Sequence, residues 1–479
     1  MILSYSNDHC KTPTNYVERL TGSYPMTKNS HQTTLGSSSG SINSLTDIDW
    51  TFDGADTSYL THGFHTYPAR MIPQIPDAIL NYYLSEGVID SGETVYDPFS
   101  GSGTTAVEAR LHGLNAEGND INPLAVMLSR AKSIPIDMKT LQAAETALLE
   151  DLETRLETVA EQVANGTYEK DSEPDVNDGW FPEPQLKQLW AIRQEIDGIE
   201  EQYGVAVARF FRICLSEITR TVSFQRNGEY KRYRMPEEKR ADHDPDVYQL
   251  FTSSLSENGQ RAREFAEQVG DDGHTSSIHY ADSRSATSNG DHSVDENSAD
   301  IVITSPPYGD HRTTVAYGQF SRDPAIIADQ HDSDEMLNVD KTGLGGSNSD
   351  FEPLPDLEEW SPSFGKTMES LREKDGRAED AMDFVRDYYE VMGEVGKILK
   401  PSQPSVWVVA NRTMSRVNIP LHLITQELCE HLGYEHDVTL PREIPTKTLP
   451  WENAPENEEG TKGDLMADEN IVILRSPEG

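Results

Sequence analysis

Short segments with the composition of buried strands recur along this chain and are separated by helical patterns. The strand-like segments stand at 93–97, 115–120, 277–281, 300–304, 405–410 and 469–475, and 434–440 is a possible partner for the last. Apolar residues spaced by three and four begin with Ile75, Ile79, Leu80 and Tyr83, and helices are also expected at 104–112, 123–131 and 381–399. Strands that alternate with helices predict an α/β fold with a mainly parallel sheet.

Two long segments interrupt this alternation. Residues 136–270 have helical patterns at 141–164, 185–201 and 205–220, with a linker at 165–178, and we interpret them as a largely helical insertion. Residues 321–380 are acidic and weakly periodic, which predicts a surface excursion. Residues 1–45 are rich in Ser, Thr, Asn and Gly and predict a flexible arm. The segments 46–135 and 271–479 then form the two parts of one α/β domain.

The net charge of the chain indicates the conditions in which the protein works. The 479 residues include 82 acidic and 40 basic side chains, a formal net charge of −42. An acidic protein can be one that repels nucleic acid. It can also come from a very salty cytoplasm, where charge repulsion is screened within about 3 Å at about 1 M salt. The acidic residues are spread along the whole chain, which favours the second interpretation, a halophilic protein.

Several classes of protein are disfavoured by simple features. No apolar run reaches the roughly eighteen residues of a membrane span, and no secretory signal is visible at the N-terminus, so we expect a cytoplasmic protein with no membrane association. Cys10, Cys214 and Cys429 lie far apart, which argues against a disulfide framework or a zinc site. His62, His65 and His311 match no metal-ligand spacing, so no residue is assigned to a metal.

The first segment that carries chemistry is VYDPFSGSGTTAVEA, residues 95–109. A Gly-rich turn between a strand and a helix lets backbone approach a ligand closely and places that ligand at a helix N-terminus. Gly101, Gly103 and Ala106 satisfy a relaxed dinucleotide fingerprint. Asp120 at the end of the next strand can accept hydrogen bonds from both hydroxyls of a ribose. A P-loop is excluded because the chain has no GxxxxGK[ST] here.

The second segment is DIVITSPPYG, residues 300–309, in which an apolar strand delivers Ser-Pro-Pro-Tyr to the carboxyl edge of the sheet. Proline has no N–H donor, so carbonyl groups here remain available as acceptors. The Ser305 side chain and the Pro306 carbonyl can hold a substrate amino group, and Tyr308 can stack on a flat base.

These segments resemble the amino-methyltransferases of DNA, the adenine-N6 and cytosine-N4 enzymes of restriction–modification systems. DPFSGSGTT resembles their cofactor loop and SPPY their catalytic motif, and HTYPARM, GNDINPLA, HYADSR, VWVVANR and ENIVILR are similar to further motifs. The resemblance covers roughly 60–135 and 275–475. It implies a Rossmann-like fold, S-adenosyl-L-methionine as cofactor and double-stranded DNA as substrate, with a cognate restriction endonuclease as a possible partner and the oligomeric state open.

The resemblance also implies roles for individual residues. Ser305, Pro306, Pro307 and Tyr308 would form the catalytic motif that positions the base. Asp120 would hold the ribose of the cofactor and Asp282 its adenine. The remaining expected cofactor residues are Tyr67, Asp97, Phe99, Gly101, Gly103 and Thr104.

The favoured reaction is methyl transfer to cytosine N4 by direct attack of a flipped-out base. Ser305 favours cytosine because adenine-N6 enzymes usually carry Asp or Asn at this position, and adenine N6 is the alternative. Methylation of cytosine carbon 5 is disfavoured because it needs a cysteine nucleophile and none is near the motif. An RNA or tRNA methyltransferase, a non-catalytic nucleic-acid-binding relative and a nicotinamide oxidoreductase rank lower.

The insertion is the expected DNA target-recognition region, because it ends in SFQRNGEYKRYRMP, a locally basic stretch in an acidic chain. Arg226, Lys231, Arg232 and Arg234 are the expected DNA contacts. The alternative is that these cations close onto acidic helices of the same protein.

Overall fold

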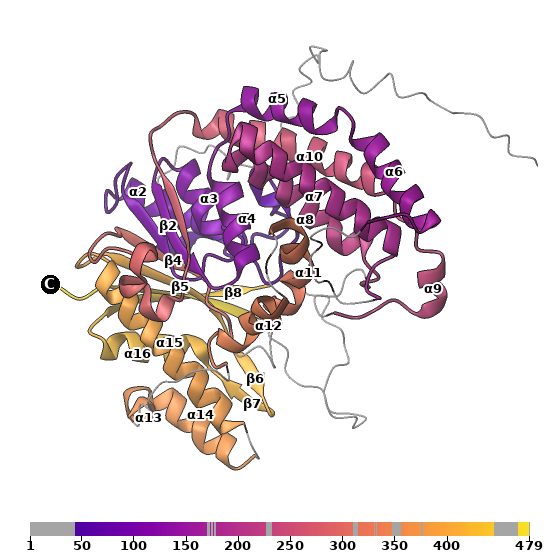
Figure 1. Cartoon of the computed structure of the whole chain (residues 1–479). Coiled ribbons are helices and arrows are strands. Elements are labelled where there is room, and N and C mark those ends of the chain that lie inside the picture. Colours follow the sequence, from indigo (N-terminus) through magenta and orange to yellow (C-terminus); the bar gives the residue numbers. More distant parts are fainter. Residues whose placement is uncertain are drawn as a thin grey trace, which may run out of the picture. The chain divides into compact units, whose positions relative to one another are not determined.

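One seven-stranded sheet organises the described residues (Figure 1), in the order β3-β2-β1-β4-β5-β9-β8. All neighbouring strands are parallel except β9, which is antiparallel to β5 and to β8. The mainly parallel sheet and the pairing of the last strand with the segment near 434–440 are therefore confirmed. The strands are β1 (Thr94–Asp97), β2 (Asn115–Asp120), β3 (Ser276–Tyr280), β4 (Ile301–Thr304), β5 (Pro404–Ala410), β8 (Glu435–Glu443) and β9 (Asp468–Arg475).

The computed structural model describes residues 44–169, 173, 176, 179–226, 232–309, 315–329, 331, 333–346, 356–374, 377–444 and 468–478. The expected flexible arm 1–45 thus lies outside the described residues except for its last two positions. Lys231 and His311 also lie outside them.

The strand order reverses between β1 and β4. From β1 the chain builds β2 and β3 toward one edge, and from β4 it builds β5 toward the other. Helical crossovers on either side of such a reversal leave a crevice beyond the carboxyl ends of the two central strands, which is where open α/β sheets bind ligands. The Gly-rich loop follows β1 and the SPPY motif follows β4, so the topology brings both motifs to this crevice.

The two faces of the sheet carry separate hydrophobic cores because successive side chains along a strand point to opposite faces. Val95 and Ile301 lie in one core with the apolar face of α2, whereas Tyr96 and Val302 lie in the other with α15. The first face is covered by α2 (Gln74–Ser85), α3 (Thr104–Leu111) and α4 (Pro123–Ser133). The second is covered by α15 (Ala378–Ile398) and α16 (Leu421–His431), with α13 (Leu357–Trp360), α14 (Pro362–Arg372) and a small hairpin, β6 (Arg412–Met414) and β7 (Val417–Ile419).

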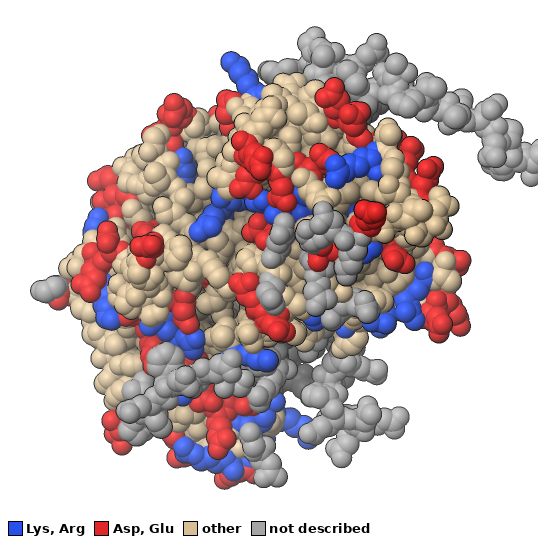
Figure 2. Space-filling model, viewed as in Figure 1, with Lys and Arg blue, Asp and Glu red and all other residues tan. Residues whose placement is uncertain are grey.

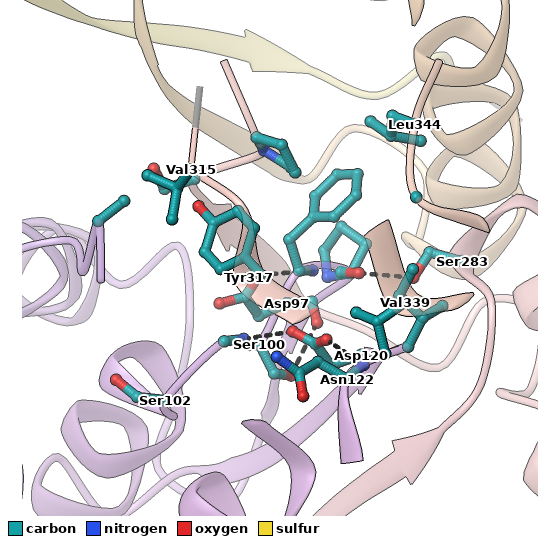
Figure 3. Close-up of a pocket in the computed structure, with 18 of the residues that line it drawn as sticks. Asp97, Ser100, Ser102, Asp120, Asn122, Ser283, Val315, Tyr317, Val339 and Leu344 are labelled. Carbon is teal, nitrogen blue, oxygen red and sulfur yellow. Dashed lines mark hydrogen bonds between the residues drawn. The ribbon is translucent and has the colours of Figure 1, made fainter. Parts of the chain in front are cut away.

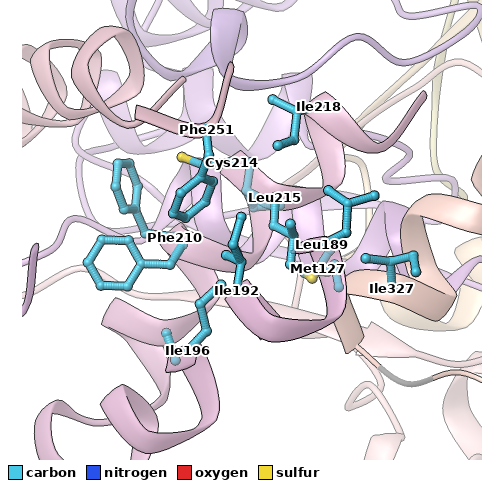
Figure 4. Packing of buried hydrophobic residues seen from close by; sticks show 14 of the residues in the cluster. Met127, Leu189, Ile192, Ile196, Phe210, Cys214, Leu215, Ile218, Phe251 and Ile327 are labelled. Carbon is cyan, nitrogen blue, oxygen red and sulfur yellow. The ribbon is translucent and has the colours of Figure 1, made fainter. Parts of the chain in front are cut away.

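The insertion forms a helical layer beside α4 (Figure 1). Its helices pack Leu189, Phe210 and Phe251 against Met127 of α4 in a third core (Figure 4). The segment expected as one helix over 141–164 is two, and a long helix at the end of the insertion was not expected. The helices are α5 (Met138–Leu149), α6 (Leu152–Asn165), α7 (Glu183–Tyr203), α8 (Val205–Val222), α9 (Glu237–Ala241) and α10 (Val247–Val269).

The segment 321–380, expected as a surface excursion, instead contributes helices with buried faces where the structure describes it. It contains most of α11 (Tyr317–Asp329), all of α12 (Ser333–Thr342) and the helices α13 and α14. Ile326 and Ile327 of α11 are at most 1% exposed and belong to the core of the helical layer. The short apolar run at 325–328 is flanked by polar and acidic sequence, so local periodicity does not reveal a buried helix.

Membrane spans and reactive thiols are both missing from the described part of the chain. No helix among the described residues has the length and apolar character needed to cross a membrane. Cys214 and Cys429 are buried free thiols, the first in the helical layer and the second in the core of the second sheet face. Burial raises the pKa of the Cys214 thiol to about 12.

Gly103 gives the fold a testable constraint, because it has φ 86° and a Cβ there would lie 2.7 Å from the Cα of Ser129 in α4. We expect Gly103→Ala to lower the free energy of unfolding by about 2–4 kcal/mol, from left-handed backbone strain plus overpacking. Gly166, with φ 68° and nothing within 4 Å of its Cβ position, is the matched control. Gly166→Ala should cost only about 1–2 kcal/mol. Equal losses in denaturant unfolding would refute the tight α3–α4 contact.

Candidate functional site

A cavity opens at the carboxyl edge of the sheet, at the reversal between β1 and β4 (Figure 3). Its wall combines the Gly-rich loop, the ends of β1 and β2, and the start of the SPPY motif. Nine expected site residues line it: Tyr67, Asp97, Phe99, Gly101, Thr104, Asp120, Asp282, Ser305 and Pro307. Gly103, Pro306 and Tyr308 do not line the cavity. Gly103 packs against α4, Pro306 is buried, and Tyr308 lies behind Ser305.

Asp120 ties the Gly-rich loop to the turn that follows β2. Its Oδ2 accepts a hydrogen bond from the backbone N–H of Gly101 at 2.9 Å, and its Oδ1 accepts one from the N–H of Asn122 at 2.7 Å. Gly101 has φ 49°, and a Cβ there would meet the Tyr67 ring at 4.0 Å. A narrow space therefore remains between the backbone of the loop at Gly101 and the Tyr67 ring. We call this space the Gly101 cradle, and a residue larger than glycine would partly fill it.

Asp97 stands beside Asp120 at the end of β1 and is 5% exposed. Its Oδ1 accepts hydrogen bonds from the Thr304 hydroxyl at 2.6 Å and from the N–H of Phe99 at 3.0 Å. Burial raises the pKa of Asp97 to about 6. Burial also raises the pKa of Asp120 to about 6, and the nearby Asp97 adds to that rise. Two carboxylates that ionise reluctantly in one cavity favour a ligand that brings positive charge and hydroxyl donors.

Aromatic side chains close another side of the cavity. The Tyr67 hydroxyl accepts a hydrogen bond from Asn122 Nδ2 at 2.9 Å, and Asn122 also donates to the Ser321 hydroxyl of α11 at 2.8 Å. The rings of Tyr67 and Tyr317 stack with centroids 6.0 Å apart. The helix α11 thus contributes a flat wall to the cavity and is fastened to the turn that Asp120 organises.

Asp282 lines the cavity and forms an ion pair with Arg284. Arg284 Nη2 lies 2.6 Å from Asp282 Oδ2, and Arg284 Nη1 lies 2.9 Å from Oδ2 of the buried Asp387. Arg284 also donates to the Thr342 carbonyl at the end of α12. A ligand ring at Asp282 would therefore contact a carboxylate whose position is fixed from behind by an ion-pair network.

The SPPY motif contains a chain of hydrogen bonds behind the cavity wall. The Tyr308 hydroxyl donates to Glu469 Oε1 at 3.1 Å, and Glu469 pairs with Arg442 through its other oxygen. Ser305 Oγ lies 3.2 Å from the Tyr308 hydroxyl oxygen. Because the Tyr308 proton is directed to Glu469, Ser305 donates to Tyr308, which leaves the lone pairs of Ser305 Oγ as acceptors toward the cavity.

Sequence reasoning missed several residues of this site. Asn122 could have been found, because an Asn before a proline is a common helix N-cap, and Asn122 caps α4 by accepting from the N–H of Leu124. Glu469 lies in ENIVILR, which resembles a family motif, but nothing in that segment indicates a contact with Tyr308. Tyr317 precedes the segment interpreted as surface, and nothing in its local sequence assigns it to the cavity. Further unexpected lining residues are Arg70, Arg284, Asp340, Thr342 and Leu344.

The basic stretch is only partly available for an external partner. Arg232 Nη2 lies 2.8 Å from Oδ2 of the buried Asp323 in α11, and its guanidinium lies over the Trp180 ring. Arg232 thus closes onto an acidic residue of the same protein, which is the alternative given above, and its contact with DNA stays a prediction. Arg226 and Arg234 are exposed.

The histidines near the motifs take part in hydrogen bonds. His62 Nε2 lies 2.7 Å from Oε1 of the buried Glu108, and His65 Nε2 lies 2.9 Å from the Ser216 hydroxyl. These contacts fasten the segment before Tyr67 to α3 and to α8. They position one wall of the cavity.

The cavity fits S-adenosyl-L-methionine by the chemistry of its donors and acceptors. Asp120 offers carboxylate oxygens for ribose hydroxyls, Asp97 an anionic group for a cationic ligand, and Asp282 with Phe99 a polar and an apolar contact for an adenine ring. The Gly101 cradle adjoins these groups. When bound, this cofactor supplies an electrophilic methyl group for transfer.

The raised pKa values of Asp97 and Asp120 generate a pH prediction. Both acids are ionised above about pH 6, so affinity for the cationic cofactor should rise as pH rises through 6 and fall below it. Calorimetry across this range tests it. Asp120→Ala should weaken binding at high pH by roughly 1.5–3 kcal/mol, whereas the exposed Asp295→Ala should not. A pH-independent affinity, or equal affinity in both variants, would contradict the ribose assignment.

No family model matches the chain. The type II methyltransferase M.MvaI of Kocuria varians is 35% identical over 432 residues, which cover 89% of this chain and 93% of that protein. The type II methyltransferase M.MjaII of Methanocaldococcus jannaschii is 26% identical over 153 residues, 31% of this chain and 26% of that protein.

Among solved structures, a Thermus thermophilus protein described as a putative DNA modification methylase, complexed with S-adenosyl-L-methionine, aligns over 42% of this chain and 54% of its own. The identity is 19% and the TM-score 0.21, a likeness too low to add to the fold described above. The full-length relationship to M.MvaI decides the family. This chain belongs to the type II DNA methyltransferases of restriction–modification systems, which use S-adenosyl-L-methionine as methyl donor.

Proposed function

We propose that this DNA methyltransferase modifies the exocyclic N4 of cytosine. The observation that carries the proposal is Ser305, a neutral acceptor in the cavity wall whose own proton is directed to Tyr308. A target amino group must lose a proton as it is methylated, and Ser305 Oγ would accept a hydrogen bond from it and orient its lone pair. Positioning of the reacting groups then supplies most of the acceleration.

The remaining residues have supporting roles in this proposal. Asp97, Asp120, Asp282 and the Gly-rich loop hold the cofactor. Pro306 and Pro307 fix the backbone of the motif and keep the Pro306 carbonyl available as an acceptor. Tyr308 does not line the cavity, so its main role here is to orient Ser305 through its hydroxyl rather than to stack on the base. We also propose that the target base is flipped out of the duplex, since its amino group is otherwise inside the stack.

Adenine N6 is the second candidate product, because its amino group has nearly the same geometry. Methylation at carbon 5 stays disfavoured, because neither of the two described cysteines, Cys214 and Cys429, lines the cavity. We propose that the enzyme is cytoplasmic, because its DNA substrate lies in the cytoplasm. We also propose a cognate restriction endonuclease as its partner. Arg226 and Arg234 in the helical insertion remain proposed DNA contacts.

The product assignment gives a direct prediction. Mass spectrometry of nucleosides from DNA of a host that expresses the protein should detect N4-methylcytosine. Tyr308→Phe keeps the ring and removes the hydroxyl, so it should lower kcat by roughly tenfold or more, the value of one strong hydrogen bond. Ser305→Ala should lower kcat as well, and both variants should bind the cofactor like the wild type. N6-methyladenine alone would refute the cytosine assignment, and 5-methylcytosine would refute the direct-attack mechanism.

The net charge of −42 generates a salt prediction. Acidic side chains are spread over the visible face of the molecule and are not gathered in one patch (Figure 2). We propose adaptation to a saline cytoplasm, in which about 1 M salt screens this repulsion. The folded signal in circular dichroism and the activity should then both be lost on dilution. Full activity at about 50 mM salt, the low end of the usual DNA-binding range, would contradict the proposal.

A further inference from the structure

A second surface of this acidic protein concentrates positive charge. An open groove lies between α14 and the β6–β7 hairpin, and three of the residues that line it are Lys366, Lys374 and Arg416. All three are exposed, and none of them forms an ion pair with another described residue. Lys and Arg side chains gather over this end of the molecule in Figure 2, with acidic side chains between them. We call this surface the basic groove.

The helix α14 presents one polar face to the basic groove. Ser363, Lys366 and Ser370 are spaced by three and four residues, and Lys374 continues the row just beyond the helix, so these side chains share one side. The opposite face, with Phe364, Met368 and Leu371, is buried in the core on the second face of the sheet. Hydroxyl and ammonium groups in one row are the groups that proteins use to contact nucleic-acid phosphates.

The hairpin places Arg416 at the tip of a tight turn. Ser415 and Arg416 form the two-residue connection between β6 and β7, with φ of 49° and 62°. Such a turn normally takes Asn-Gly, because only glycine adopts this conformation without a steric penalty. Arg416 is exposed and contributes nothing to the core, so packing does not explain an arginine in this unfavourable conformation.

The hairpin is joined to the catalytic motif. Arg412, the first residue of β6, donates from Nη1 to the Tyr308 carbonyl at 3.3 Å. A Cβ on Gly309 would lie 1.0 Å from Arg412 Nη1, so the glycine allows the two segments to touch. The hairpin also follows the carboxyl end of β5 after one residue, Asn411. The basic groove therefore begins at the same edge of the sheet as the cavity.

We propose that the basic groove binds the phosphate backbone of the duplex whose base enters the cavity, an inference that rests on the DNA methyltransferase function. Lys366, Lys374 and Arg416 contact phosphates, and Ser363, Ser370 and Asn418 add neutral hydrogen bonds. The occupant is double-stranded DNA because Lys, Arg and hydroxyl groups in a row complement a regular line of phosphates. These contacts fix the register of the protein on DNA and carry no base specificity.

The test compares two variants of equal charge. The groove variant carries Lys366→Gln, Lys374→Gln and Arg416→Gln, and the control carries Lys139→Gln, Lys239→Gln and Arg263→Gln, exposed cations of α5, α9 and α10. Binding of a fluorescent duplex is measured over the range of salt in which the protein stays folded, and cofactor binding is measured by calorimetry. The groove variant should bind DNA at least about tenfold more weakly than the control, because its phosphate contacts are lost.

The salt dependence separates phosphate contacts from a general charge effect. The slope of log affinity against log salt should become shallower by roughly 0.9 for each lost contact in the groove variant, and cofactor affinity should not change. Equal affinity and equal slope in the two variants would overturn the proposal. Because the readout is binding, it stays decisive even if the wild type yields no methylated DNA, which would instead refute the enzymatic function.

A single variant guards against a folding artefact. Arg416→Gly removes the charge and at the same time relieves the unfavourable backbone conformation of the turn. It should keep or raise the thermal midpoint while binding DNA more weakly than the wild type. Normal DNA binding by this stable variant would show that Arg416 does not contact DNA.

Discussion

The Asp120 carboxylate is the interaction on which this site depends. One oxygen accepts a hydrogen bond from the Gly-rich loop after β1, and the other accepts one from the turn after β2. These two bonds fix the loop and the turn relative to each other. Through Asn122 the same turn fastens Tyr67 and α11. Burial makes this carboxylate reluctant to ionise. The arrangement is therefore expected to be most favourable when a ligand with hydroxyl donors and positive charge occupies the cavity, which is the chemistry of the cofactor used by the family.

The catalytic motif is supported in a comparable way from behind. Arg442 and Glu469 fix the Tyr308 hydroxyl, and Tyr308 in turn orients Ser305. The other end of the motif is held by Arg412 through the Tyr308 carbonyl. Supporting residues from β8, β9 and β6 thus converge on a loop of four residues. This explains why a short sequence with only one hydroxyl acceptor in the cavity wall can present a defined acceptor geometry.

Charge is distributed in this protein according to two requirements. The acidic side chains are spread over the surface. Many of the protein's basic side chains form internal ion pairs, such as Arg232 with Asp323 and Arg284 with Asp387. Cations that remain exposed without such partners are therefore informative. In an acidic protein, affinity for DNA has to come from a few well-placed cations together with contacts to the bases.

The sequence by itself determined the parts that depend on local patterns. The strand at 300–304, the Gly-rich loop and Asp120 could be recognised because strand periodicity, turn chemistry and helix ends are encoded by neighbouring residues. The tertiary structure alone decided which distant residues complete the site. Glu469 and Arg412 lie in segments that resemble family motifs, but nothing local shows their contacts with Tyr308 or places Tyr317 in the cavity wall. These contacts arise from the order of strands in the sheet and from packing between segments far apart in the chain. The tertiary structure also decided that Arg232 pairs with Asp323. A sequence shows that a residue is basic, but only packing shows whether a buried carboxylate already pairs with it.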